Sequence, residues 1–280
     1  MNVTKLNYNK YTTGSGVGCT TYSNRSALKR RATNCCTTKC AVITNINLSD
    51  IVTLVSSNNN TSILECQSLT IQMGDTLVIP STNVFNNYGT IIINGTIINN
   101  GIINNYGTIY NNNIITNNST SISAIAIINN YNIINITNAN SIILNETGSV
   151  FNNKSSGRIS NFGRISQRGV DTYGVAVFNN DGILKNTGIN VSITIENYFV
   201  FINNGIIYNN DSGFGMNGTG SLKNYNIIFN YNNSYINIQG GCTFENYGTL
   251  YNGDSSCGGT HPSFNSTPNP LGTVIIGCPP

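Results

Sequence analysis

A six-residue spacing of aliphatic and polar positions dominates the middle of the chain. From Gly89 the sequence reads GTIIIN, GTIINN, GIINNY, GTIYNN and NIITNN. Five isoleucines are thereby held six residues apart: Ile91, Ile97, Ile103, Ile109 and Ile115. Six is not a helical period, but it suits a coil of short strands and bends that stacks on the next coil. The pattern predicts a parallel β-helix with these isoleucines inside as a core ladder and Gly89, Gly95, Gly101 and Gly107 at the corners.

Beyond Asn118 the unit lengthens into an apolar-x-Asn-aromatic-Gly phrase, as in ISNFGRIS and FENYGTLYN. The central residues of successive phrases are 19, 23, 21 and 22 positions apart, at Phe162, Asp181, Asn204, Tyr225 and Tyr247. We therefore expect an all-β chain that forms a single parallel β-helix with coils of about 18 to 22 residues. The irregular spacing favours a right-handed helix over a left-handed one.

Composition supports this fold, because 53 of the 280 residues are Asn and 40 are Ile. Glycine and asparagine adopt the left-handed backbone angles of tight corners at least cost, so we expect both there. Equivalent asparagines of stacked coils can form amide ladders, and β-branched isoleucine suits the interior. A disordered Asn-rich tract is the alternative, but it would not keep its aliphatic residues in six-residue register.

The chain divides into four regions by composition. Residues 1–40 lack strand alternation and are expected to be a basic, Cys-containing arm. Residues 41–82 contain strand-like runs, including IVTLVSS at 51 to 57, and are expected to form an N-terminal cap or first irregular coils. The solenoid body then covers 83–252, and a Gly/Ser/Pro-rich C-terminal flap covers 253–280.

Ionisable groups are scarce, at 8% of residues, and His261 is the one histidine. Carboxylates on one outer face, as in polysaccharide lyases and hydrolases, are the enzymatic alternative; Asp171, Asp181 and Asp211 with Arg164 and Arg168 are its candidates. The remaining acids of the body are Glu146, Glu196, Glu245 and Asp254. Because no catalytic spacing recurs, scattered solubilising charges are favoured, and His261 is expected to be incidental. We predict no catalytic residues, no cofactor and no small-molecule substrate.

Aromatic residues recur at the centres of the repeats, at Tyr88, Tyr106, Tyr131, Phe162, Tyr198, Tyr225 and Tyr247. A stripe of this kind either binds sugar rings or stabilises the corners by stacking, and the structural role is favoured.

The first 49 residues hold seven basic side chains and no acid, whereas the remainder carries six bases and ten acids. We expect Arg25, Lys29, Arg30 and Arg31 to anchor the arm to an acidic surface. The eight cysteines are disulfide candidates, within or between chains, and their 105 pairings remain open. They are Cys19, Cys35, Cys36, Cys40, Cys66, Cys242, Cys257 and Cys278. A four-thiolate zinc site of Cys35, Cys36, Cys40 and Cys66 is the less favoured alternative, because adjacent cysteines are awkward zinc ligands.

No apolar stretch approaches the length of a membrane span, and the start MNVTKLNYNK lacks the apolar segment of a signal peptide. From sequence we therefore expect neither a membrane span nor a secretory signal.

The phrases TLVIPSTNVFNNYGTIIINGTIINNGIINNYGTI and FENYGTLYN resemble the Asn/Gly/Ile-repeat β-solenoid proteins of giant double-stranded DNA viruses of amoebae. More distantly they are similar to the repeats of filamentous-haemagglutinin-type adhesins. The viral resemblance implies a non-enzymatic structural protein of the virion, assembled in the host cytoplasm as a capsid-associated component, fibre or scaffold. Its expected partners are other copies of itself or other structural proteins. A carbohydrate-binding adhesin or polysaccharide-active β-helix enzyme is the alternative.

Overall fold

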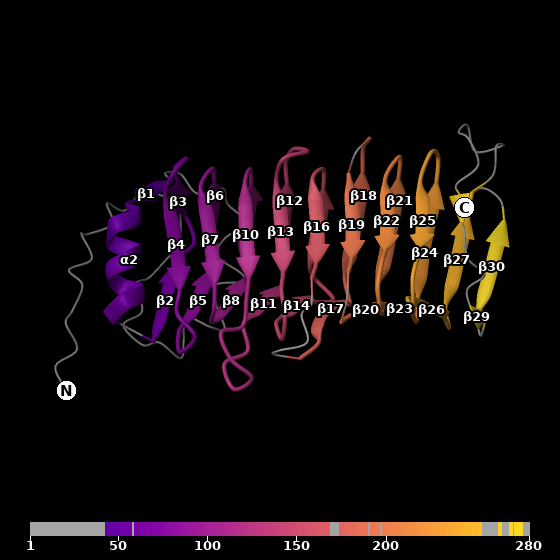
Figure 1. Cartoon of the computed structure of the whole chain (residues 1–280). Helices are drawn as coiled ribbons and strands as arrows, with labels where there is room; N and C mark the ends of the chain where they lie inside the picture. The colour runs from indigo at the N-terminus through magenta and orange to yellow at the C-terminus, as the bar shows by residue number, and fades with distance from the viewer. Residues whose placement is uncertain are drawn as a thin grey trace. The chain divides into compact units, whose positions relative to one another are not determined.

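Three parallel β-sheets, named A, B and C, are wound by one chain that visits them in the order A, C, B in each coil (Figure 1). The computed structural model describes residues 43–57, 59–168, 174–189, 191–196, 198–253, 263–264, 269–270 and 272–276. Every pairing between its named strands is parallel, and each strand except those at the ends of the sheets lies between its counterparts in the preceding and following coils. The predicted parallel β-solenoid is confirmed.

Within the described residues, sheet A contains β1 (Thr44–Ile46), β3 (Gln67–Ile71), β6 (Thr90–Ile93), β9 (Thr108–Asn111), β12 (Ile133–Ile136), β15 (Arg158–Asn161), β18 (Ile183–Thr187), β21 (Ile206–Asn210), β24 (Ile227–Tyr231), β27 (Thr249–Asn252) and β30 (Thr273–Ile276). Sheet B contains β2 (Asn60–Ile63), β5 (Val84–Asn87), β8 (Ile102–Asn105), β11 (Ile127–Asn130), β14 (Val150–Asn153), β17 (Ala176–Asn180), β20 (Phe199–Asn203), β23 (Ser221–Asn224), β26 (Thr243–Asn246) and β29 (Asn269–Pro270). Sheet C contains β4 (Thr76–Ile79), β7 (Thr96–Asn99), β10 (Ile114–Asn117), β13 (Ile142–Asn145), β16 (Arg164–Gln167), β19 (Ser192–Ile195), β22 (Gly213–Met216), β25 (Tyr235–Ile238) and β28 (Ser263–Phe264).

Coil length varies more than the sequence spacing predicts. Equivalent residues are 18 apart from Asn87 to Asn105, within the regular six-residue units. They are 28 apart from Asn117 to Asn145. The expected limit of about 22 residues is therefore wrong for the middle coils. The physical reason is that extra residues enter at the corners, for example between β10 and β11, without disturbing the strand register.

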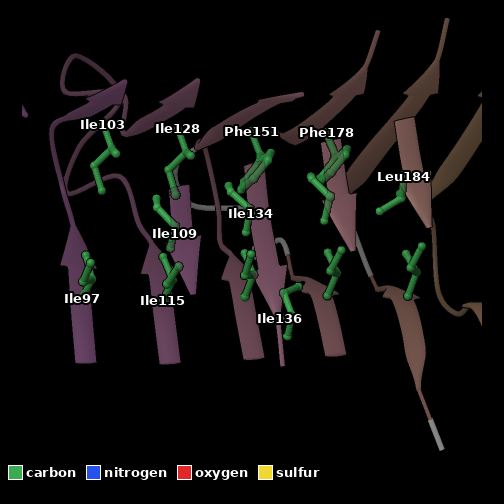
Figure 2. Close-up of a cluster of buried hydrophobic side chains, with 14 of the residues drawn as sticks. Ile97, Ile103, Ile109, Ile115, Ile128, Ile134, Ile136, Phe151, Phe178 and Leu184 are labelled. Carbon is green, nitrogen blue, oxygen red and sulfur yellow. The ribbon is translucent and has the colours of Figure 1, made fainter. Parts of the chain in front are cut away.

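Two positions of most strands point into the solenoid, because the second and fourth residues of a four-residue strand share one face. The second position is usually aliphatic. All five isoleucines of the core ladder, Ile91, Ile97, Ile103, Ile109 and Ile115, are at most 3% exposed. Figure 2 shows several of these side chains converging on the interior with Ile128, Ile134 and Phe151. The inward aliphatic position therefore recurs at each strand of the regular units.

A helix, α2 (Leu48–Ser57), covers the N-terminal end of this interior (Figure 1). Its Ile51 and Val55 are buried in the hydrophobic core cluster. The prediction of a strand at 51 to 57 is wrong. Ile51 and Val55 are four residues apart, which places both on one face of a helix, and Asp50 in the first turn complements the helix dipole.

The end of the chain adds strands to the stack. β28, β29 and β30 pair in parallel with β25, β26 and β27, respectively. The described parts of the 253–280 region therefore extend all three sheets by one coil.

Glycine is required at the corners because neighbouring coils approach closely there. The four repeat glycines lie in the bends between strands, and none of them is among the described residues with a positive φ. A Cβ on Gly107 would lie 2.0 Å from the carbonyl oxygen of Gly89 in the preceding coil. A Cβ on Gly95 would lie 2.3 Å from the carbonyl oxygen of Asp75. Glycine is selected at these positions because a side chain would clash with the backbone of the preceding coil, and not because the backbone is left-handed.

Candidate functional site

The fourth residue of each sheet B strand from β5 to β14 is a buried asparagine, and equivalent asparagines of later coils continue the same row. In this inner ladder each Nδ2 donates to the Oδ1 of the next coil at 2.7 to 2.8 Å. All its members are 0% exposed: Asn87, Asn105, Asn130, Asn153, Asn180, Asn203, Asn224 and Asn246. The amide rows that the sequence predicts are present, but this one lies inside the solenoid rather than on its corners.

Shorter inner ladders occur in the other two sheets. Sheet C joins Asn99, Asn117 and Asn145, and sheet A joins Asn161, Asn186, Asn209, Asn230 and Asn252. Sequence reasoning missed that these asparagines point inward. The signal was present, since each follows an inward aliphatic residue by two positions, as Asn99 follows Ile97, and alternate residues of a strand share a face.

A second set of hydrogen bonds ties the buried amides to backbone carbonyl groups of the following corner, of the next coil, or of both. Asn99 Nδ2 donates to the carbonyl oxygen of Gly101 at 3.1 Å, and the Gly101 amide donates back to Asn99 Oδ1 at 3.3 Å. Asn99 Nδ2 also reaches the carbonyl oxygen of Ile127 in the next coil at 3.1 Å. Because these groups are buried, leaving one unpaired would carry a desolvation penalty of about 1–3 kcal/mol. The ladders therefore fix both the corner and the stacking of the coils.

The ladders are imperfect at their ends. In the part of the chain that the structure describes, Asn87 Oδ1 is buried without a hydrogen-bond partner, because Ile63 occupies the equivalent place in the preceding coil. Gln167 follows Asn145 in sheet C, and neither polar atom of its longer side chain is paired. Continuity therefore requires asparagine in every coil.

An outer amide ladder runs along the solvent face of sheet B. It comprises Asn60, Asn86, Asn104, Asn129, Asn152 and Asn179, with Nδ2 to Oδ1 distances of 2.8 to 2.9 Å. Here each Nδ2 donates toward the N-terminal coil, opposite to the inner ladder of the same sheet. Sheet B therefore carries antiparallel rows of amide dipoles on its two faces.

The seven repeat aromatics do not form one stripe. Five lie at the corner between sheets B and A: Tyr88, Tyr106, Tyr131, Tyr225 and Tyr247. Phe162 lies at the corner between sheets A and C, and Tyr198 lies between sheets C and B. Tyr106 stacks on Tyr88 and Tyr131 with ring centroids 4.9 and 4.6 Å apart. Tyr225 and Tyr247 form a separate stack at 4.9 Å.

Two further aromatic stacks were not anticipated. Tyr208, Phe229 and Tyr251 stack on the outer face of sheet A, with centroids 5.0 and 4.9 Å apart. On the inner face of sheet B, the ring of Phe178 stacks on the rings of Phe151 and Phe201, with centroids 4.7 Å apart in both pairs. Equivalent strand positions face one another in successive coils, so a residue type that recurs at a position becomes a stack.

The acidic residues are dispersed over the solenoid. Asp181 lies at the corner between sheets B and A, Asp211 lies between A and C, and Glu196 lies between C and B. Arg164 is an exposed residue of β16. The convergence of Asp181 with Asp211 that an enzymatic site would need is therefore not formed.

Each of the two ion pairs found in the described part of the chain joins side chains of neighbouring coils. Arg168 lies 3.7 Å from Glu146, and Lys223 Nζ lies 3.5 Å from Glu245 Oε2. Tyr247 donates its hydroxyl to the same Glu245 oxygen at 2.6 Å. This hydrogen bond, followed by the charge of Lys223, lowers the pKa of the Glu245 carboxyl, so the group is held as a carboxylate. It is not tuned toward proton transfer at neutral pH.

Among the residues whose placement is described, no group of His, Cys, Asp or Glu is arranged to hold a metal ion. Within the same residues, no helix has the length and apolar character to cross a membrane.

Two of the cysteine candidates, Cys66 and Cys242, lie among the residues that the structure describes. Cys242 carries a free, half-buried thiol in the bend before β26, where burial raises its pKa. Cys66 lies in the turn before β3. The other six cysteines, the anchoring residues Arg25, Lys29, Arg30 and Arg31, and Asp171, Asp254 and His261 lie outside the described residues.

No protein-family model, curated protein or solved structure matches this chain. The resemblance to viral repeat proteins therefore rests on the sequence motifs, and the candidate surfaces rest on the geometry of the chain itself.

Proposed function

We propose that this protein is a non-enzymatic structural component of a virus particle. The observation that carries the proposal is the continuous amide ladder of sheet B, which joins coils from Asn87 to Asn246 along the solenoid. Backbone and side-chain hydrogen bonds thus act in the same direction, along the stack. An arrangement of this kind suits a stiff rod used as a fibre, scaffold or capsid decoration.

The distribution of ionisable side chains supports the same proposal. Asp181, Asp211 and Glu196 lie at three different corners, and the Glu245 carboxyl is engaged by Tyr247 and Lys223. A glycosidase pair would require two carboxyl groups within about 10 Å, on one face. A polysaccharide lyase or hydrolase is therefore the weaker candidate.

Assembly is proposed to use the rod together with the basic arm. Arg25, Lys29, Arg30 and Arg31 supply positive charge for an acidic surface of the particle. Copies of the same chain or other structural proteins are the proposed partners, and disulfides of the arm would make the attachment covalent.

Quantitative mass spectrometry of purified particles tests the proposal. We expect the protein to be enriched with the major structural proteins and retained after a high-salt wash under non-reducing conditions. Recovery only in the soluble fraction of infected cells, at trace level in particles, would contradict a structural role. A non-structural protein of comparable abundance in infected cells provides the control for carry-over.

A further inference from the structure

The outer face of sheet B from β5 to β17 carries parallel rows of chemically distinct side chains. The first row is aliphatic and comprises Val84, Ile102, Ile127, Val150 and Val177. The second row is the outer amide ladder from Asn86 to Asn179. Tyr88, Tyr106 and Tyr131 form a third row at the adjoining corner. Each row repeats at the strand spacing of about 4.8 Å.

The amide row retains hydrogen-bonding capacity. A primary amide has two N–H donors and two acceptor lone pairs, and the ladder uses one of each in Asn104, Asn129 and Asn152. These side chains are only half-buried. One donor and one acceptor per coil therefore remain for a ligand, in a straight row along the solenoid.

The strands of this face carry no outward charge. The outward residues of β5, β8, β11, β14 and β17 are Val, Ile and Asn only. A nucleic acid or another polyanion would require lysine or arginine along its path. The ligand that matches this face is consequently uncharged, rich in hydroxyl groups, and apolar on one side.

We propose that this face binds an extended, uncharged β-1,4-linked glycan chain that lies parallel to the solenoid axis. One sugar unit of such a chain advances by close to one strand spacing, so successive units meet equivalent residues. Hydroxyl groups would bond to the Asn104 and Asn129 amides, while the C–H faces of the rings would pack on Ile102 and Ile127. The five strands span about 19 Å, or about four sugar units.

The tyrosines have a subsidiary role in this arrangement. Because Tyr106 is stacked on both Tyr88 and Tyr131, its ring faces are covered by its neighbours. Its edge and hydroxyl group remain at the surface, since the residue is 39% exposed. The tyrosine row is thus a polar rim, and the aliphatic row supplies the contact with the sugar rings. This inference is independent of the proposed place in a virus particle.

Pull-down of the full chain on microcrystalline cellulose, colloidal chitin and starch granules tests the proposal. We expect binding to cellulose, chitin or both, and none to starch, whose coiled α-linked chain cannot stay in step with the strands. Binding to one β-1,4 polymer alone identifies the sugar and supports the proposal. Absence of binding to both, or equal binding to starch, overturns it.

Variants locate the binding to this face. The double variant Asn104→Ala, Asn129→Ala and the single variant Ile127→Lys are each expected to weaken binding at least about tenfold. Asn135→Ala on sheet A and Thr116→Ala on sheet C replace outward, half-buried residues of the other two sheets and should bind as the parent does. Thermal melting followed by circular dichroism confirms that each variant is folded. Equal binding by the face and control variants would refute the assignment to sheet B.

Discussion

Replacing Asn153 by aspartate would put an acceptor-only carboxylate into the middle of the inner amide ladder. Asn153 accepts from Asn130 Nδ2 at 2.8 Å and donates to Asn180 Oδ1 at 2.7 Å. It also donates to the carbonyl oxygen of Ile183 at 3.2 Å. An ionised aspartate at this position would keep the first bond but would face the Asn180 oxygen without a proton. A protonated carboxyl group would restore that bond and lose only the weaker one.

The magnitude follows from the cost of protonation. An unfolded aspartate has a pKa of about 3.9, so keeping it protonated at pH 7 costs about 4 kcal/mol, at about 1.4 kcal/mol per pH unit. This protonation cost is an upper limit on the electrostatic loss of stability, because the folded protein can take up a proton instead of burying the charge. We expect Asn153→Asp to lose about 4 kcal/mol at pH 7. The lost bond to Ile183 adds about 1 kcal/mol at every pH.

The pH dependence has a definite sign. Burial raises the pKa of the introduced carboxyl above its unfolded value, so the folded state binds the extra proton between the two pKa values. The electrostatic loss is therefore absent below about pH 4 and grows as the pH rises toward the folded pKa. Stability of the variant relative to the parent should increase on acidification.

Urea unfolding at pH 4 and pH 7, followed by circular dichroism, measures this difference. Asn152→Asp is the matched control, because Asn152 is the adjacent residue and its half-buried side chain faces solvent in the outer ladder. We expect its loss to stay within about 1 kcal/mol at both pH values. Equal losses in the two variants, or a loss for Asn153→Asp that does not change with pH, would refute the inner ladder as a stabilising element.

Three further predictions concern the core, the corners and the arm. Ile103→Asp should abolish cooperative unfolding, since it buries an unpaired charge, whereas Ile102→Asp on the outer face should remain folded by circular dichroism. Gly107→Ala should cost more than about 2 kcal/mol in urea unfolding, because the new Cβ would lie 2.0 Å from the Gly89 carbonyl oxygen; an unchanged midpoint would contradict the close approach of the coils. Deletion of residues 1–40 should leave the solenoid folded but prevent multimerisation, and a truncated protein that still assembles on non-reducing gels would show that the arm does not anchor it.

Several features of the fold follow from local sequence alone. The six-residue spacing from Ile91 to Ile115 predicts the inward position of each isoleucine, because each residue stacks on its counterpart and the pattern repeats with the coil. The same spacing places the glycines at the corners. Recurring aromatics likewise predict stacks, since equivalent positions lie one strand spacing apart.

Other features depended on how the coils meet. Residues 51 to 57 contain enough apolar residues for a strand, but a helix buries Ile51 and Val55 together against the open end of the interior. Corner insertions divided the aromatic residues among three corners, so Phe162 and Tyr198 lie apart from Tyr106. Sequence distance between repeats does not reveal which of the three corners received the extra residues.

The sequence by itself determined that this chain is a parallel β-solenoid, because the period of its aliphatic residues fits no other regular structure. Only the tertiary structure decided where the asparagines act. A buried amide is stable only if partners above and below it satisfy its hydrogen bonds, and those partners lie in other coils, as Asn130 and Asn180 do for Asn153. The uncharged outward rows of sheet B likewise exist only after β5, β8 and β11 stack in register and align residues 18 to 25 positions apart in the chain.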